Sequence, residues 1–273
     1  MIGLSIAMKS SGLVAPPFVG PFDELSDIRG AYSVRRLRAL YEGDALRLRR
    51  SSDNAESDFG FDVAGDLDVA AITSWLGVAS GFVTKWYDQS GSGWDLIQAT
   101  ADNQPLYVAS GPNGKPTVRF DGINDRLRVT FANVPTPHHI FTAAKLVSFT
   151  DGDYMFAGGT TLEIAVIETG GTGRVQMITG PSGPGVLLGT TLYHVLGAYY
   201  TTVLGANYIR LNGTQSNGVG VIVGNANVTG IVLGCRGDQT NFGNVDFSEW
   251  MMFAVQQTNS VIELNMKSYY NTP

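Results

Sequence analysis

The chain has 273 residues, a formal net charge of −6 and a pI of about 5.0, so it lacks the basic excess that binding to nucleic-acid phosphates requires. It is 44% hydrophobic and only 15% charged, with 34 glycines, which argues against disorder and favours a turn-rich all-β domain. Its one cysteine, Cys235, excludes a scaffold held by intrachain disulfides.

Residues 1–28 are predicted to form an N-terminal arm. Pro16, Pro17 and Pro21 interrupt regular structure, yet the stretch is too apolar for a free linker. The arm could pack on its own domain or dock on a partner, and both alternatives stay open. The start of the chain has no basic region ahead of an apolar core, so it does not read as a secretory signal.

Opposite charges follow one another in the next part of the chain. Six arginines fall within positions 35–50, and six acidic residues follow within positions 53–68. Because two such blocks can pair locally and cancel each other's field, we expect ion pairing here and no nucleic-acid partner.

Two helices are predicted in this lead-in, over residues 31–80. Val34, Leu37 and Leu40 recur at helical spacing and predict a short helix, and residues 44–50 then alternate as a strand. A clearer helix is predicted over 66–78, with an aspartate as its N-cap, Trp75 as a core anchor and a glycine at its end.

Downstream, short apolar runs alternate with turn residues almost to the end of the chain. Strands are predicted at 82–87, 94–100, 105–109, 116–121, 126–132, 139–149, 153–158, 161–168, 174–179, 192–200, 207–212, 218–223, 229–235 and 245–255. The predicted fold class is therefore all-β, a two-sheet antiparallel sandwich of the jelly-roll type with a few short helices. A C-terminal helix with the capping-box pair Ser260 and Glu263 closes the chain.

The stretch Trp86–Leu96 organises this pattern, because it joins two predicted strands through the turn Asp88-Gln-Ser-Gly-Ser-Gly93. Aspartate and serine side chains bond their own backbone in such turns, and the two glycines can take positive φ. If Trp94 is exposed, its ring could stack on a sugar; if it is buried, it belongs to the core.

The motifs of common enzyme classes are absent from the sequence. There is no nucleophile elbow, phosphate-binding loop, dinucleotide fingerprint or zinc-protease motif. His138 and His139 are adjacent in a predicted strand and point to opposite faces, so a shared metal is not expected. The sequence therefore predicts no catalytic residue, no required cofactor and no metal centre.

Carboxylates offer two weaker possibilities. Glycoside hydrolysis needs two of them across a cleft, and the strand-borne candidates are Glu163, Glu168, Asp246 and Glu249. Their spacings place each pair on opposite faces of a strand. Asp88, Asp121 and Asp125 could supply oxygen ligands to calcium, although ordinary turn chemistry explains them as well. The predicted carbohydrate-binding residues are Trp94, Asp88, Asn124 and Asp125.

The order of several motifs resembles LamG-like, concanavalin A-like jelly rolls over roughly residues 82–270. The matching pieces are Trp86-Tyr-Asp-Gln-Ser-Gly-Ser-Gly-Trp-Asp-Leu96, Asn103-Gln-Pro105, Lys115-Pro-Thr-Val-Arg-Phe-Asp-Gly-Ile-Asn-Asp-Arg-Leu127, Tyr208-Ile-Arg-Leu-Asn-Gly213 and Phe247-Ser-Glu-Trp-Met-Met-Phe253. The resemblance implies residues 29–273 as one such domain, with 82–270 as its core sandwich.

The upstream motifs are similar to two more particular groups. Ala31-Tyr-Ser-Val-Arg-Arg-Leu-Arg-Ala-Leu-Tyr41, Ala45-Leu-Arg-Leu-Arg-Arg-Ser-Ser-Asp-Asn-Ala-Glu56 and Tyr87-Asp-Gln-Ser-Gly91 follow the order seen in the catalytic domain of fungal arabinofuranosidase B and, more closely, in tailed-bacteriophage virion proteins. The cysteines of the enzyme are absent, and none of its catalytic carboxylates can be placed on a residue of this chain.

The closer resemblance implies a phage virion structural protein, either a capsid decoration or a tail or fibre adhesion module with affinity for host glycans. Its partners would be other virion proteins, bound through the arm, and further copies of itself. We expect assembly in the host cytoplasm, location in the virion and no membrane insertion, because no apolar run reaches ~20 residues. The alternatives are an arabinofuranosidase-like glycoside hydrolase and a free carbohydrate-binding module.

Overall fold

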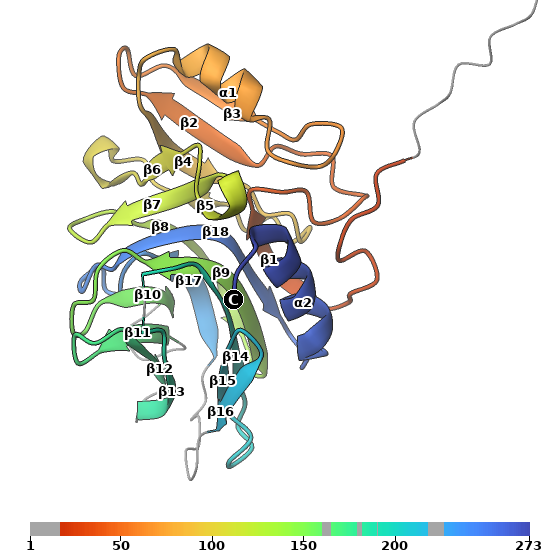
Figure 1. Ribbon diagram of the computed structural model, residues 1–273, viewed down its shortest axis with the longest axis vertical. Coiled ribbons are helices and arrows are strands. Elements are labelled where there is room, and N and C mark those ends of the chain that lie inside the picture. The colour runs from red at the N-terminus through yellow and green to blue at the C-terminus, as the bar shows by residue number, and fades with distance from the viewer. Residues whose placement is uncertain (1–16, 160–164, 179–181, 190, 218–226) are drawn as a thin grey trace, which may run out of the picture.

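The computed structural model describes residues 17–159, 165–178, 182–189, 191–217 and 227–273. The described chain is all-β with two α-helices and two short 3₁₀ helices (Figure 1). The strands are β1 (Ile28–Ser33), β2 (Leu46–Arg50), β3 (Glu56–Phe59), β4 (Gly81–Trp86), β5 (Leu96–Ile97), β6 (Leu106–Val108), β7 (Thr117–Asp121), β8 (Leu127–Val134), β9 (His138–Leu146), β10 (Tyr154–Gly158), β11 (Ala165–Thr169), β12 (Arg174–Ile178), β13 (Ser182–Leu187), β14 (His194–Tyr200), β15 (Tyr208–Leu211), β16 (Thr214–Asn217), β17 (Val228–Leu233) and β18 (Asn244–Phe253). The helices are α1 (Val69–Leu76), α2 (Asn259–Tyr270), η1 (Ala101–Asn103) and η2 (Pro112–Gly114).

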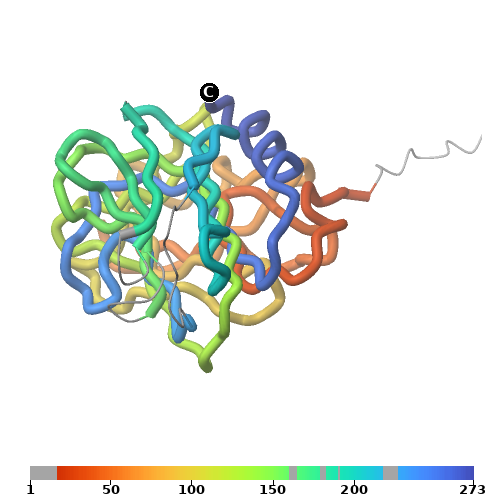
Figure 2. The backbone as a smooth tube through the Cα atoms, turned by 90° about the horizontal axis from the view of Figure 1, so that it is seen from below, coloured from red at the N-terminus to blue at the C-terminus, as the bar shows by residue number. Residues whose placement is uncertain are grey.

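The prediction of two separate sheets is wrong, because hydrogen bonds join all 18 of these strands into one antiparallel sheet. One run of ladders passes from β16 through β15, β14 and β9 to β18 and β7, and another from β8 through β17 and β10 to β13. The sheet folds back on itself until β13 contacts β15 and β16, which makes it nearly closed and barrel-like. Figure 2 shows the chain from below, with α2 on one side.

A very short strand joins the two runs. β5 has only two residues, and Ile97 pairs with Lys85 of β4 and with Arg128 of β8. β4 also pairs with β6, which pairs with β7. A two-residue strand has no alternation pattern of its own, so this connection cannot be predicted from the sequence pattern.

The core lies inside the folded sheet and is rich in aromatic rings. Tyr32, Trp86, Phe156 and Trp250 are each buried, and Trp250 contacts Tyr32 and Phe156 with ring centroids 6.0 and 5.7 Å apart. Such rings remove large apolar areas from water, and this burial stabilises the fold without any disulfide. Cys235 is buried and free.

Helix α1 confirms the prediction for residues 66–78. Asp68 is its N-cap and accepts a hydrogen bond from the backbone N–H of Ala71, and Gly77, with φ +61°, ends it. Trp75 is partly buried and packs edge-on against Phe59, with centroids 5.3 Å apart.

The helix predicted near residues 34–41 does not form. β1 ends at Ser33, and the chain then runs irregularly because the side chain of Gln89 accepts the backbone N–H of Leu37 at 2.9 Å. A helix would need that N–H for its own ladder. Tertiary contacts therefore override the local spacing here.

Helix α2 lies beside β1 and packs on β14 and β9 (Figure 1). Ile262, Met266 and Tyr270 of this helix are buried. The capping box is wrong: Thr258 is the N-cap, and Glu263 forms an ion pair with Arg210 at 2.6 Å instead of reaching back to the helix start. No helix among the described residues is long and apolar enough to cross a bilayer.

The described part of the predicted arm packs on the same domain. Phe22 is buried, and its backbone N–H donates to the Leu37 carbonyl at 3.1 Å. The side chain of Phe18 contacts Gly65 and lies under the guanidinium of Arg36. Residues 1–16 lie outside the described residues, so docking of this segment on a partner stays a prediction.

Candidate functional site

The turn Asp88–Gly93 holds the lead-in onto the sheet. One carboxylate oxygen of Asp88 accepts the backbone N–H groups of Ala31 and Ser90, and the other accepts the N–H of Trp94 and the hydroxyl of Ser90. Gln89 accepts from Leu37 and donates to the carbonyls of Ser33 and Arg35. Asp88 is thus fully engaged in structural hydrogen bonds.

Trp94, the predicted sugar platform, packs on the core. Its ring stacks on Phe131 with centroids 3.8 Å apart and an interplanar angle of 13°. One face of the indole is therefore covered. The β8 segment from Leu127 to Phe131 spans about 13 Å at the rise of an extended strand. Trp94 therefore contacts β8 at a point distant from the loop that carries Asn124 and Asp125. The structure does not bring the four predicted sugar-binding residues together.

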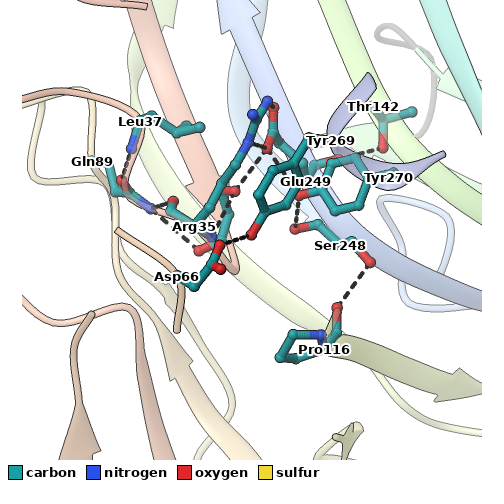
Figure 3. A network of polar contacts seen from close by, with 11 residues as sticks. Arg35, Leu37, Asp66, Gln89, Pro116, Thr142, Ser248, Glu249, Tyr269 and Tyr270 are labelled. Carbon is teal, nitrogen blue, oxygen red and sulfur yellow. Dashed lines mark hydrogen bonds and ion pairs between the residues drawn. The ribbon is translucent and has the colours of Figure 1, made fainter. Parts of the chain in front are cut away.

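Glu249 lies at the centre of a buried polar network (Figure 3). Arg35 binds it through two nitrogens at 2.7 and 3.1 Å, and the hydroxyls of Ser33 and Tyr270 donate to it at 2.8 and 2.9 Å. The guanidinium of Arg35 also lies 4.4 Å from the centroid of the Tyr269 ring. Glu249 is entirely buried, so this network secures β1 and α2 to β18 and offers no open carboxylate.

The other strand carboxylates are engaged in a similar way. Glu168 accepts three consecutive backbone N–H groups, those of Gly171, Thr172 and Gly173, and so shapes the turn after β11. Asp246 is held by Arg119 at 2.7 and 2.8 Å and by the Tyr193 hydroxyl at 3.1 Å. Glu163 lies outside the described residues. No catalytic pair comes from the described members of this set.

Aspartates from several loops gather at one end of the sheet. The strand registers Asp121–Asn244 and Leu127–Leu233 place the β7–β8 loop beside the β17–β18 loop, and an isolated bridge from Tyr154 to Phe242 adds the loop before β10. We call this set of loops, residues 121–126, 149–153, 170–173 and 234–243, the acidic rim. It carries Asp121, Asp125, Asp151, Asp153 and Asp238.

Asp125 stands out on the acidic rim. The residue is only 7% exposed, and its carboxyl accepts one hydrogen bond, from the backbone N–H of Asp121 at 3.1 Å. Burial, followed by the negative charge of Asp121, raises the pKa of Asp125 to about 7. Asp121 is itself exposed, and its Oδ1 accepts the backbone N–H groups of residues 123–125. One carboxyl of this neighbouring pair therefore keeps a proton near neutral pH.

These two aspartates line a pocket of about 500 Å³ beside β4 and β6. Its other walls include Phe82, Gln104 and the arginines Arg49 and Arg119. Arg49 donates to Gln104 at 2.6 Å and lies 4.9 Å from the centroid of the Phe82 ring, while Arg119 is fixed by Asp246. The pocket thus combines a protonated carboxyl, a second carboxylate and positioned donors, and its volume is typical of small-ligand sites.

Two further aspartates on the acidic rim also have displaced pKa values. Burial and the charge of Glu168 raise the pKa of Asp153 to about 6, against a hydrogen bond from Thr150 that lowers it. The Thr240 hydroxyl lowers the pKa of Asp238. Asp238 sits in a turn where Gln239 and Asn241 adopt positive φ, a conformation that non-glycine residues seldom take. Neither aspartate is predicted as a site residue from the sequence, because only the strand register places them on the acidic rim.

The described residues contain no cluster of three or more His, Cys, Asp or Glu side chains that could hold a metal ion. Asp88 is used at the central turn, away from the loop of Asp121 and Asp125, so the three calcium candidates do not converge. His139 is buried against Tyr208 and Gln257, and burial lowers its pKa to about 3.

Some arginines of the arginine-rich lead-in form ion pairs with nearby acidic residues. Arg47 pairs with Asp58 at 2.6 Å and Arg50 with Asp53 at 2.7 Å, as predicted from the charge blocks. Arg35 departs from this pattern because its partner is Glu249, more than two hundred positions away.

No protein-family model matches the chain, and no curated protein matches it. Solved structures do share its fold. An arabinofuranosidase complexed with arabinofuranosyl-α-1,2-xylobiose matches 92% of the chain with a TM-score of 0.76 and 17% identity, and a GH54 α-L-arabinofuranosidase soaked with a cyclic sulfate inhibitor matches 92% with a TM-score of 0.75 and 17% identity. The chain covers 65% and 66% of those two structures, just under two thirds of their length.

A more distant likeness links the chain to a Trypanosoma rangeli sialidase in complex with 2,3-difluorosialic acid. It covers 68% of this chain and 31% of the sialidase, with a TM-score of 0.53 and 11% identity. The similarity to arabinofuranosidases that the sequence motifs indicate is thus confirmed at the level of the fold. The prediction of a phage virion structural protein is wrong, because these matches are to glycosidases and favour the hydrolase alternative.

Proposed function

We propose that this chain is a glycoside hydrolase domain that releases arabinofuranosyl groups. The observation that carries the proposal is the match of 92% of the chain, at a TM-score of 0.76, to an arabinofuranosidase. The site that supports it within the chain is the pocket of Asp121 and Asp125.

In this proposal Asp125 is the proton donor. Glycoside hydrolysis requires an acid that protonates the leaving oxygen and a second carboxylate that attacks the sugar or activates water. Asp125 retains a proton near pH 7 because burial and the charge of Asp121 oppose its ionisation. Asp121 supplies the second carboxylate from the same turn.

The arginines of the pocket position the sugar. Guanidinium groups donate hydrogen bonds in a fixed plane, so they suit hydroxyl and ring oxygens. Arg119 is held in place by Asp246 and Arg49 by Gln104, and neither has to be ordered when the substrate arrives. Such pre-organisation lowers the entropic cost of binding.

The test is release of 4-nitrophenol from 4-nitrophenyl α-L-arabinofuranoside at pH 6. We expect Asp125→Asn to lower kcat by about 10²- to 10⁴-fold, the usual contribution of a positioned acid or base, and Asp121→Asn to lower it by a similar factor. Asp53→Asn is the control, because Asp53 forms an exposed ion pair with Arg50 and does not line the pocket. A wild-type protein without turnover, or full activity in both pocket variants, would contradict the proposal.

A further inference from the structure

The pocket at Asp125 continues into a second hollow. This hollow, of about 440 Å³, lies between the end of α1 and β6. Ser80, Leu106 and Arg119 line both spaces. Two hollows that share three walls are parts of one depression, which we call the β6 groove.

The second hollow has apolar walls beside open backbone. Leu76, Leu106 and Val108 supply the apolar surface. β6 pairs with β7 at three positions, but its ladder with β4 consists of the single pair Phe82–Leu106. Past Leu106, no described strand pairs with the β4 side of β6, so backbone polar groups at this edge are available to a ligand.

This combination fits a sugar chain better than a lipid. A sugar ring presents an apolar face and a belt of hydroxyl groups, and it needs both a flat apolar contact and several donors and acceptors. A lipid would leave the open strand edge unsatisfied. At the junction of the hollows, Nε and Nη2 of Arg119 are bound to Asp246, while its Nη1 makes no hydrogen bond to the described residues.

We propose that the β6 groove binds the glycan backbone that carries the arabinofuranosyl branch, with the branch at Asp121 and Asp125 and the backbone running over Leu106 toward α1. The inference rests on the proposed function for the identity of the branch. Its own content is the location and the substrate class: an oligosaccharide or polysaccharide several units long, bound along β6.

The experiment measures binding, so that it does not depend on turnover. Titration calorimetry would compare arabinofuranosyl-xylobiose with an arabinofuranosyl-xylopentaose on the full chain carrying Asp125→Asn. Two further substitutions would reduce the volume of the hollow at α1. They are Ala109→Trp, at an exposed lining position, and Ala79→Trp, at a partly exposed lining position. Ala70→Trp, on the exposed side of α1 and outside the groove, is the matched control.

We expect the longer probe to bind about tenfold more tightly than the shorter one, a difference equivalent to 1.4 kcal/mol. Ala109→Trp and Ala79→Trp should each remove this gain, and Ala70→Trp should keep it. Equal affinity for both probes, or a gain that persists in both groove variants, would overturn the inference. Length-dependent binding without hydrolysis would overturn the proposed function alone, and hydrolysis without length dependence would overturn the β6 groove alone.

Discussion

Glu249 and Asp125 are two carboxyl groups shielded from solvent in very different surroundings. Glu249 accepts hydrogen bonds from four side-chain donors, two of them on the charged guanidinium of Arg35. Asp125 accepts one backbone hydrogen bond and faces the negative charge of Asp121. A buried carboxylate with charged and hydrogen-bonding partners holds structural elements together. A buried carboxyl without such partners keeps its proton, which it can donate in a reaction.

The largest effect that tests this comparison is expected from Glu249→Gln. The change keeps the shape of the side chain but leaves the charge of Arg35 buried without its partner, and breaking a buried pair costs about 3–5 kcal/mol. Urea denaturation monitored by tryptophan fluorescence would measure the loss. Asp58→Asn, which removes the partly exposed partner of Arg47, is the control and should cost less than about 1 kcal/mol. Equal midpoints for Glu249→Gln and wild type would refute the structural role.

Asp88→Ala should have an intermediate effect. The substitution leaves the backbone N–H groups of Ala31 and Trp94 without their acceptor, and an unsatisfied buried donor costs about 1–3 kcal/mol. The same denaturation experiment measures it, with Ser92→Ala in the same turn as a neutral control. If Asp88→Ala were as stable as wild type but lost its affinity for glycans, Asp88 would belong with Asp125 as a binding group.

Asp125→Asn should not destabilise the protein near neutral pH, and its effect should depend on pH. Folding raises the pKa of Asp125 from an ordinary value of about 4 to about 7. Below pH 4 the carboxyl is protonated in both states. Between pH 4 and 7 the unfolded chain ionises first, so wild type loses stability as the pH rises, and above pH 7 the penalty is complete.

The asparagine variant cannot ionise, so its stability relative to wild type should increase from pH 4 to pH 7 and then level off. Thermal unfolding of both proteins at several pH values would show this. Asp102→Asn, at an exposed position on the wall of the same pocket, should show no such trend. A constant difference between Asp125→Asn and wild type across this range would mean that Asp125 is not held protonated.

The sequence predicts the parts of this fold that rest on local pattern. Alternation identifies most strands, and the aspartate and glycine at the two ends of α1 identify that helix. β13 is missed because Pro181-Ser-Gly-Pro-Gly185 reads as a turn, whereas its ladder with β12 makes Ser182–Leu187 a strand. The closure of the sheet is missed because it depends on the short strand β5.

In the candidate site, too, the local sequence pattern predicts some features, and others depend on tertiary contacts. The turn residues Asp121, Asn124 and Asp125 can be recognised from the sequence, but the raised pKa of Asp125 depends on burial that only the folded sheet supplies. Likewise, Glu249 is a plausible catalytic carboxylate until its partner Arg35 is known. Whether a carboxylate is free to react or is held by an ion pair depends on the residues packed around it, and these residues are distant in the sequence.

The most direct test of the account is the pH dependence of kcat/KM for 4-nitrophenyl α-L-arabinofuranoside with the wild-type protein. If Asp125 donates the proton, activity should fall as the pH rises above about 7, where Asp125 loses that proton. Activity that stays constant up to pH 9, or no turnover at any pH, would contradict the assignment of this pocket as a glycosidase site.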